Sequence, residues 1–206
     1  MAEKKERKTL LSTLKAVARD LNHDQFMIME YLGPIVDGSR AALSLSIEKA
    51  RELHQISEAE FEAFMDTTEQ SFLDLTICFQ ANDIEATHSL VFDSSEAYIF
   101  EDCVEPDVII SGTERLLMNL FDADSDVDPI EELGQGYGIA GNDSGNIIEA
   151  LGLLCYTPLL RIARSGVDPS SLLSEDADAI ILVSASDLVT KIVRRWIDVQ
   201  LANADD

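Results

Sequence analysis

Basic residues are scarce in this sequence, and their scarcity excludes one large class of functions. The 206 residues include 15 lysines and arginines against 39 aspartates and glutamates, which gives a net charge of −24. A field of that sign repels the phosphates of nucleic acids and the surfaces of anionic membranes. We therefore expect no nucleic-acid partner. Few lysines and many aspartates also suggest a salt-rich, halophile-like cytoplasm, where counter-ions screen the repulsion between like charges.

Cysteines are also few, and none belongs to a metal-binding or redox motif. Cys78, Cys103 and Cys155 are far apart in the sequence and form no CxxC pair, and Cys78 and Cys155 have apolar neighbours on both sides. This pattern is typical of buried thiols, so we expect no disulfide bond.

Long apolar runs are missing as well. No run approaches the roughly 18 residues that a membrane-spanning helix requires. Residues 9–17 (TLLSTLKAV) are short and are interrupted by Ser, Thr and Lys, which is not the pattern of a signal peptide. With 46% hydrophobic residues, the chain can still bury a substantial core. We expect a soluble, cytoplasmic protein with no membrane span.

Helical periodicity dominates residues 1–71, which we interpret as an N-terminal helical extension. Leu10, Leu14 and Leu21 recur at helical spacing, and Thr9 precedes them as a candidate N-cap. Further helical patterns continue to about residue 70. A third predicted helix covers residues 39–54, and a capping-box pattern starts at Ser57.

The pattern changes to an alternation of period two near residue 72. Three short strands are predicted at residues 73–81, 85–93 and 96–104, with turns between them, which favours an antiparallel meander. There follow a strand (107–111), a helix (114–121), an acidic loop, a Gly-rich strand (134–142) and a helix from about residue 146. The expected fold class is α+β, with a mostly antiparallel sheet covered by helices on one face.

The acidic loop invites a calcium hypothesis, which its spacing does not support. Asp122, Asp124, Asp126 and Asp128 alternate like the first ligands of an EF-hand loop, which needs glycine sixth and glutamate twelfth. Counting from Asp122, residues 127 and 133 are Val and Leu. We expect a solvated loop and no metal site.

Motifs for catalysis or cofactor binding are absent from the sequence. The glycines of residues 134–145 match neither a P-loop nor a dinucleotide fingerprint, the three histidines are scattered, and Ser111 lacks a nucleophile-elbow motif. We expect no catalytic residue, no cofactor and a non-enzymatic protein. The hypothesis of an active site assembled only in three dimensions stays open.

An ordered series of segments suggests a family. Residues 106–110 (PDVII) follow the three strands, residues 111–113 (SGT) begin a leucine-rich helix, and residues 137–142 (YGIAGN) form the last strand. This series resembles the sterol carrier protein-2-like lipid-transfer domains. The chain departs from the family pattern at Gln135, where a glycine is usual, and at Asn142, which replaces an aspartate.

The resemblance covers residues 72–164 and implies a curved sheet with an apolar tunnel between it and the helices. The implied function is non-enzymatic binding or carriage of an apolar or lipid-like ligand. Gly152 would leave room beside the second helix. The alternative is that the same side chains form an ordinary filled core. The candidate ligand-binding residues are Leu116, Leu117, Leu120, Phe121, Ile147, Leu151, Leu154 and Cys155.

The C-terminal part, residues 165–206, suggests a second function. After a linker (SGVDPSS, 165–171), a predicted helix carries Leu188, Ile192, Val193, Trp196 and Ile197 on one face. Large apolar and aromatic groups of this kind often anchor interfaces. The alternative to ligand binding is therefore a structural or regulatory interaction module, which forms homo-oligomers through its helical ends.

Overall fold

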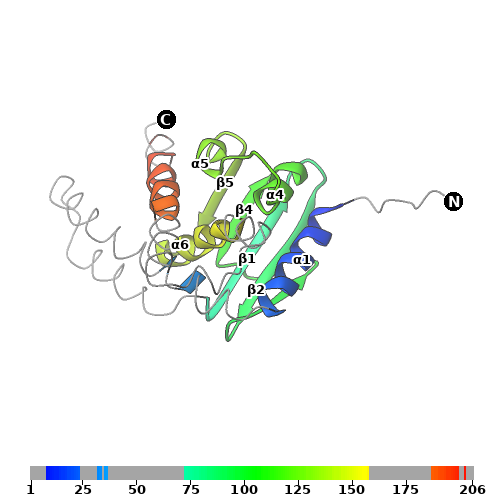
Figure 1. Cartoon of the computed structure of the whole chain (residues 1–206). Helices are drawn as coiled ribbons and strands as arrows, with labels where there is room; N and C mark the ends of the chain where they lie inside the picture. The colour runs from blue at the N-terminus through cyan, green and yellow to red at the C-terminus, as the bar shows by residue number, and fades with distance from the viewer. Residues whose placement is uncertain are drawn as a thin grey trace.

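A computed structural model describes residues 8–23, 32–33, 35–36, 72–157, 187–199 and 202 (Figure 1). It confirms the α+β class that the sequence predicts. A further helix covers residues 187–199. The remaining elements, in chain order, are α1 (Leu10–His23), β1 (Asp74–Ala81), β2 (Ala86–Asp93), β3 (Glu96–Phe100), β4 (Val108–Gly112), α4 (Glu114–Leu120), α5 (Pro129–Glu132), β5 (Tyr137–Gly141), α6 (Ser144–Gly152) and the 3-10 helix η2 (Leu153–Cys155).

Strands β1, β2 and β3 form the antiparallel meander that the sequence predicts. The turn between β2 and β3 consists of Ser94 and Ser95, whose φ angles are 52° and 70°. Positive φ at both central residues is typical of a type I′ turn, whose twist matches that of the two strands. This local geometry sets the register, in which Asp93 is paired with Glu96.

The complete sheet is mixed, with the strand order β3-β2-β1-β4-β5. β4 pairs with β1 in parallel, and its pairing with β5 is antiparallel. Because β3 lies at one edge and β4 lies beyond β1, the chain has to cross β2 and β1 after it leaves β3. Residues 101–107 make this crossing, and we call them the crossing segment.

The crossing segment is bonded to the strands that it passes, and one of these bonds corrects a prediction. Cys103 forms a disulfide with Cys78 of β1, with the two Cα atoms 5.6 Å apart. On β2, Ser89 Oγ donates a hydrogen bond to the carbonyl oxygen of Asp102 at 2.6 Å. The expectation of three buried thiols is therefore wrong for this pair. The two cysteines are 25 residues apart, and only the strand order brings them together.

The two faces of the sheet have different surroundings. Along β1, the alternate residues from Leu75 to Ala81 are almost fully buried, whereas Asp74 and Gln80 on the opposite face are exposed. Helices α1, α4 and α6 pack on the buried face, where their apolar side chains join those of the strands in one core cluster (Figure 1). We call the opposite face, which the crossing segment passes over, the open face.

Each edge of the sheet is covered by a side chain from a helix. At the β3 edge, Asn22 of α1 donates from Nδ2 to the carbonyl of Ala97 at 2.6 Å, and its Oδ1 accepts from the Ala97 amide at 2.8 Å. At the β5 edge, Trp196 Nε1 donates to the carbonyl of Ile139 at 3.2 Å. Unpaired strand edges invite pairing with other chains, so these bonds protect the sheet.

In the N-terminal extension, the structure describes the first predicted helix, α1. Thr9 Oγ1 accepts from the amide of Ser12 at 3.2 Å, which confirms the predicted cap of α1. Within residues 24–70 the structure describes only residues 32–33 and 35–36, which are helical, so the predicted helices there lie largely outside the described residues. The linker at 165–171 and the domain boundary at 164/165 lie outside them altogether. Of the helices in the described part of the chain, none has the length and apolar character needed to cross a membrane.

Candidate functional site

The two helices that carry most of the candidate binding residues, α4 and α6, begin at well-formed caps. Thr113 Oγ1 accepts from the amide of Leu116 at 3.2 Å at the start of α4, as the SGT motif predicts. Asp143 Oδ1 accepts from the amide of Gly145 at 2.6 Å at the start of α6. Such caps satisfy amides that have no partner within the helix. They fix the positions from which α4 and α6 direct their apolar faces towards the sheet.

The eight candidate residues all lie in the core between these helices and the sheet. Their exposed fractions range from 0% to 9%, and all eight belong to one cluster of buried apolar side chains. Phe121, for example, packs edge-to-face on Phe79 of β1, with the ring centroids 5.6 Å apart. The apolar stripes of the sequence therefore do converge on one layer, which is the layer where the resemblance implies a tunnel.

The space expected beside Gly152 is occupied. A Cβ atom placed on Gly152 would collide with Cγ2 of Val36, and the ring of Phe72 lies just beyond. The expectation that this glycine leaves room for a ligand is therefore wrong. Its role is close packing, since a residue with a side chain would displace Val36 from the core.

A cavity of about 410 Å³ opens at one end of the same layer. We call it the helix-side cavity. Two candidate residues from different elements, Leu120 of α4 and Leu154 of η2, line it. Thr157 holds these elements together, because its Oγ1 donates to the carbonyl of Leu120 at 2.5 Å. The other lining residues are Asn119, Ser125, Asp126, Val127, Asp128, Pro129, Thr157 and Leu188.

Sequence reasoning identified only part of this lining. Leu188 was predicted on the apolar face of the C-terminal helix, but as an interface residue. Val127 was not predicted as a lining residue, because a single apolar residue among aspartates forms no periodic pattern. Its apolar side chain in an otherwise acidic loop was the one sign that it is partly buried. It is partly buried and packs against the core cluster. The acidic loop is solvated as expected, with Asp124, Asp126 and Asp128 exposed, and it also forms one wall of the cavity.

Two of the alternating aspartates serve as acceptors for backbone amides. Asp128 Oδ1 accepts from the amide of Ile130 at 2.8 Å and caps the short helix α5. Asp122 Oδ1 accepts from the amide of Asp124 at 3.1 Å, and its Oδ2 pairs with Lys8 Nζ at 3.0 Å. Within the described ranges, no group of three His, Cys, Asp or Glu residues is arranged to hold a metal ion.

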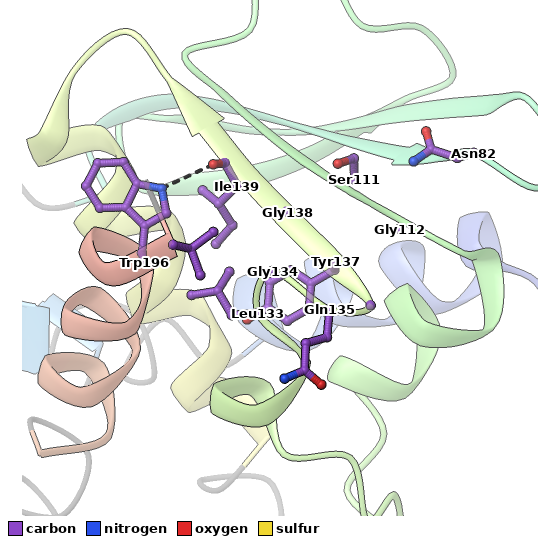
Figure 2. A pocket seen from close by; sticks show the side chains of 12 residues that line it. Asn82, Ser111, Gly112, Leu133, Gly134, Gln135, Tyr137, Gly138, Ile139 and Trp196 are labelled. Carbon is purple, nitrogen blue, oxygen red and sulfur yellow. Dashed lines mark hydrogen bonds between the residues drawn. The ribbon is translucent and has the colours of Figure 1, made fainter. Parts of the chain in front are cut away.

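A second cavity, of about 320 Å³, lies along the β5 edge (Figure 2). Most of its lining residues belong to β5 and to the turn before it, and Trp196 lines it from the C-terminal helix. Gly134 is required in this turn: its φ angle is 78°, and a Cβ atom there would lie 2.7 Å from Val199 Cγ2. Figure 2 shows the indole of Trp196 directed at the carbonyl of Ile139. The cavity thus lies where the C-terminal helix meets the sheet.

Two buried side chains near these cavities, Cys155 and Tyr137, have raised pKa values and are neutral near neutral pH. Burial raises the pKa of the Cys155 thiol to about 12. Burial, with Asp128 and Glu132 nearby, also raises the pKa of Tyr137, whose hydroxyl donates to the carbonyl of Pro129 at 3.0 Å. A thiol needs its anionic form to act as a nucleophile, so Cys155 is not suited to nucleophilic chemistry near neutral pH.

Comparison of the chain with protein-family models, with curated proteins and with solved structures returned no match.

Proposed function

We propose that the protein binds an amphiphile with an apolar chain, in the helix-side cavity and without chemical conversion. The observation that supports this best is the meeting of Leu120 and Leu154, from separate helices, at a cavity of about 410 Å³. Ligand pockets typically measure roughly 300–1,000 Å³ and combine apolar walls with a few polar groups. The order of elements from β1 to α6 follows the series that carries the resemblance to lipid-transfer domains.

The charges at the cavity restrict the headgroup of such a ligand. Asp126 and Asp128 lie in the wall, together with the uncharged polar groups of Asn119, Ser125 and Thr157. A carboxylate headgroup would be repelled by two aspartates and by a chain of net charge −24. We therefore infer a neutral or cationic headgroup, with the alkyl chain directed towards Leu120 and Leu154. Each buried methylene contributes roughly 0.8 kcal/mol to binding.

The first experiment measures displacement of a fluorescent apolar probe from the purified protein by long-chain ligands of equal length. A monoacylglycerol and an alkylammonium are expected to displace the probe at lower concentration than the matching fatty acid near pH 7. Extraction of the purified protein with organic solvent, followed by mass spectrometry, would identify any co-purified lipid. Absence of both displacement and co-purified lipid would contradict the proposal.

A variant at Val127 locates the site. Val127→Trp fills the cavity from the loop side without altering α4 or η2, so probe binding should fall by about tenfold or more. Val127→Ile is the matched control, which keeps the apolar surface and most of the free volume. Equal binding by Val127→Trp and the wild type would place any ligand elsewhere.

Oligomerisation through the C-terminal helix has less support. Val189, Ile192 and Val193 are buried within the chain, and Trp196 is hydrogen-bonded to β5. These groups are therefore engaged by the protein's own sheet and core, and fewer of them are available to a partner.

A further inference from the structure

The open face of the sheet carries an apolar groove of about 380 Å³ that has no part in the proposed ligand site. We call it the open-face groove. Its floor is formed by Thr76 of β1 together with Ser89 and Val91 of β2. The end of β3 and the crossing segment form its walls. These wall residues are Phe100, Glu101, Asp102 and Val104.

The strand register explains why apolar groups gather here. Cys78, Ser89 and Phe100 are paired across β1, β2 and β3, and Thr76, Val91 and Tyr98 form the next row. Alternate residues of a strand point to one face, so both rows lie on the open face. The disulfide from Cys78 and the hydrogen bond from Ser89 hold the crossing segment above them. The groove is therefore built by covalent and hydrogen-bonded contacts, not by a loosely placed loop.

Most of the exposed large apolar side chains among the described residues lie in or beside the groove. Four large apolar side chains in this part of the chain are exposed, and three of them are Tyr98, Phe100 and Val104 around the groove. Phe100 is 55% exposed and Val104 is 72% exposed. Clustered exposed apolar groups mark interaction sites more often than scattered ones do. Ile84, the fourth, lies apart in the turn between β1 and β2.

Charge identifies the kind of partner that this surface fits. From Phe72 to Thr113 the chain contains no lysine or arginine. Glu101 and Asp102 border the groove, and Glu105 is exposed next to it. A partner that complements this acidic border therefore has to carry basic residues. A second copy of this chain, with its net negative charge, would be repelled by the border. The acidic residues of this stretch are Asp74, Asp83, Glu85, Asp93, Glu96, Glu101, Asp102, Glu105 and Asp107.

We propose that the open-face groove binds a lysine- or arginine-rich segment of another protein, which inserts one large apolar side chain between Phe100 and Val104. The backbone of such a segment does not extend the sheet at Ala97, because Asn22 already occupies that part of the β3 edge. Recognition thus depends on the inserted side chain and on the acidic rim. Anchors of this kind, in a desolvated centre with a charged rim, dominate the affinity of many interfaces.

The experiment uses the full chain and a short fluorescent peptide in which lysines flank a Leu-Phe pair. Fluorescence anisotropy is expected to show saturable binding at low ionic strength, weakening as salt is added because the rim charges are screened. Two further peptides serve as controls: one with glutamates in place of the lysines, and one with serines in place of the Leu-Phe pair. Both should bind at least about tenfold more weakly.

Three substitutions locate the binding surface. Phe100→Ser and Val104→Ser should each weaken binding of the lysine peptide, by about tenfold for the aromatic residue. Ile84→Ser removes an exposed apolar side chain of similar exposure outside the groove, and its binding should equal that of the wild type. Val104 is the most exposed of these residues, so its substitution tests the groove even if Phe100→Ser folds poorly.

The proposal is overturned if the wild type does not bind the lysine peptide, or if both groove variants bind it as tightly as Ile84→Ser. It is also overturned if the serine-substituted peptide binds equally well, because the peptide would then be held by its lysines alone and no apolar side chain would enter the groove. Light scattering that shows a dimer disrupted by Val104→Ser would assign the groove to a second copy of the chain instead.

Discussion

Cysteine chemistry provides the sharpest test at the scale of single residues. Cys78 and Cys103 are joined in a disulfide, whereas Cys155 keeps its thiol, and burial raises its pKa to about 12. A thiol reagent near pH 8 should therefore find almost no reactive thiol in the native protein. Under denaturing conditions it should find one, and after reduction three. The measurement is a spectrophotometric thiol titration in the three conditions.

A Cys155→Ala variant serves as the control for this titration, since it should show no thiol under denaturing conditions before reduction. Three thiols without reduction would contradict the disulfide and would restore the expectation from the sequence. The result also bears on the predicted cytoplasmic location, because disulfides persist mainly in oxidising compartments.

For single residues, burial could be predicted from the sequence, but the free space beside a residue could not. Helical spacing correctly identified Leu116, Leu117 and Leu151 as inward-facing, because burial of an apolar stripe is a property of one helix. Whether a space beside a residue is filled depends on a second segment. The sequence predicts room beside Gly152, but Val36, far away in the sequence, fills that space. Pockets and cores use the same residue types, so composition could not separate them.

At the scale of elements, α1 is expected to protect the β3 edge through Asn22. Asn22→Ala removes both hydrogen bonds to Ala97 and leaves that amide and carbonyl without these partners, which should cost about 1–3 kcal/mol of unfolding free energy. Urea denaturation followed by circular dichroism measures this loss. An edge freed in this way should also promote concentration-dependent association, which light scattering detects.

Asn22→Asp separates the two bonds, because a carboxylate still accepts from the Ala97 amide but cannot donate to its carbonyl. We expect a stability between those of the wild type and Asn22→Ala. If Asn22→Ala were as stable and as monomeric as the wild type, the edge would not depend on this side chain.

Elements with strong local signals were predicted well, and those defined by distant pairing were not. Alternation of period two identified the strands, and Ser94 and Ser95 identified the turn between β2 and β3. The parallel pairing of β1 with β4 leaves no comparable signal, since either strand could have paired with several others. The four-residue helix α5 was also missed, because one turn is too short to show helical periodicity.

At the scale of the whole molecule, the sheet separates two kinds of surface. Its helix-covered face contains the core and, at one end, the helix-side cavity that we propose for an amphiphile. Its open face carries the groove that we propose for a basic partner. Of these two surfaces, only the helix-covered one could be predicted from the sequence. The sequence indicated the covered layer through its leucines, whereas the open-face groove depends on a disulfide and a crossing that the sequence did not suggest.

The large net charge should make the stability of the whole molecule depend on salt. At −24, the folded chain brings like charges closer together than the unfolded chain does, and this repulsion weakens as ions screen it. We expect the unfolding temperature to rise by several degrees between low and molar potassium chloride. Screening predicts a steep rise at first, because the Debye length already falls to about 10 Å at about 0.1 M salt. Differential scanning calorimetry across this range, with sucrose at matched osmolality as the uncharged control, measures the effect. A flat response to salt would show that the acidic surface is not destabilising, and the salt-rich cytoplasm inferred from composition would lose its basis.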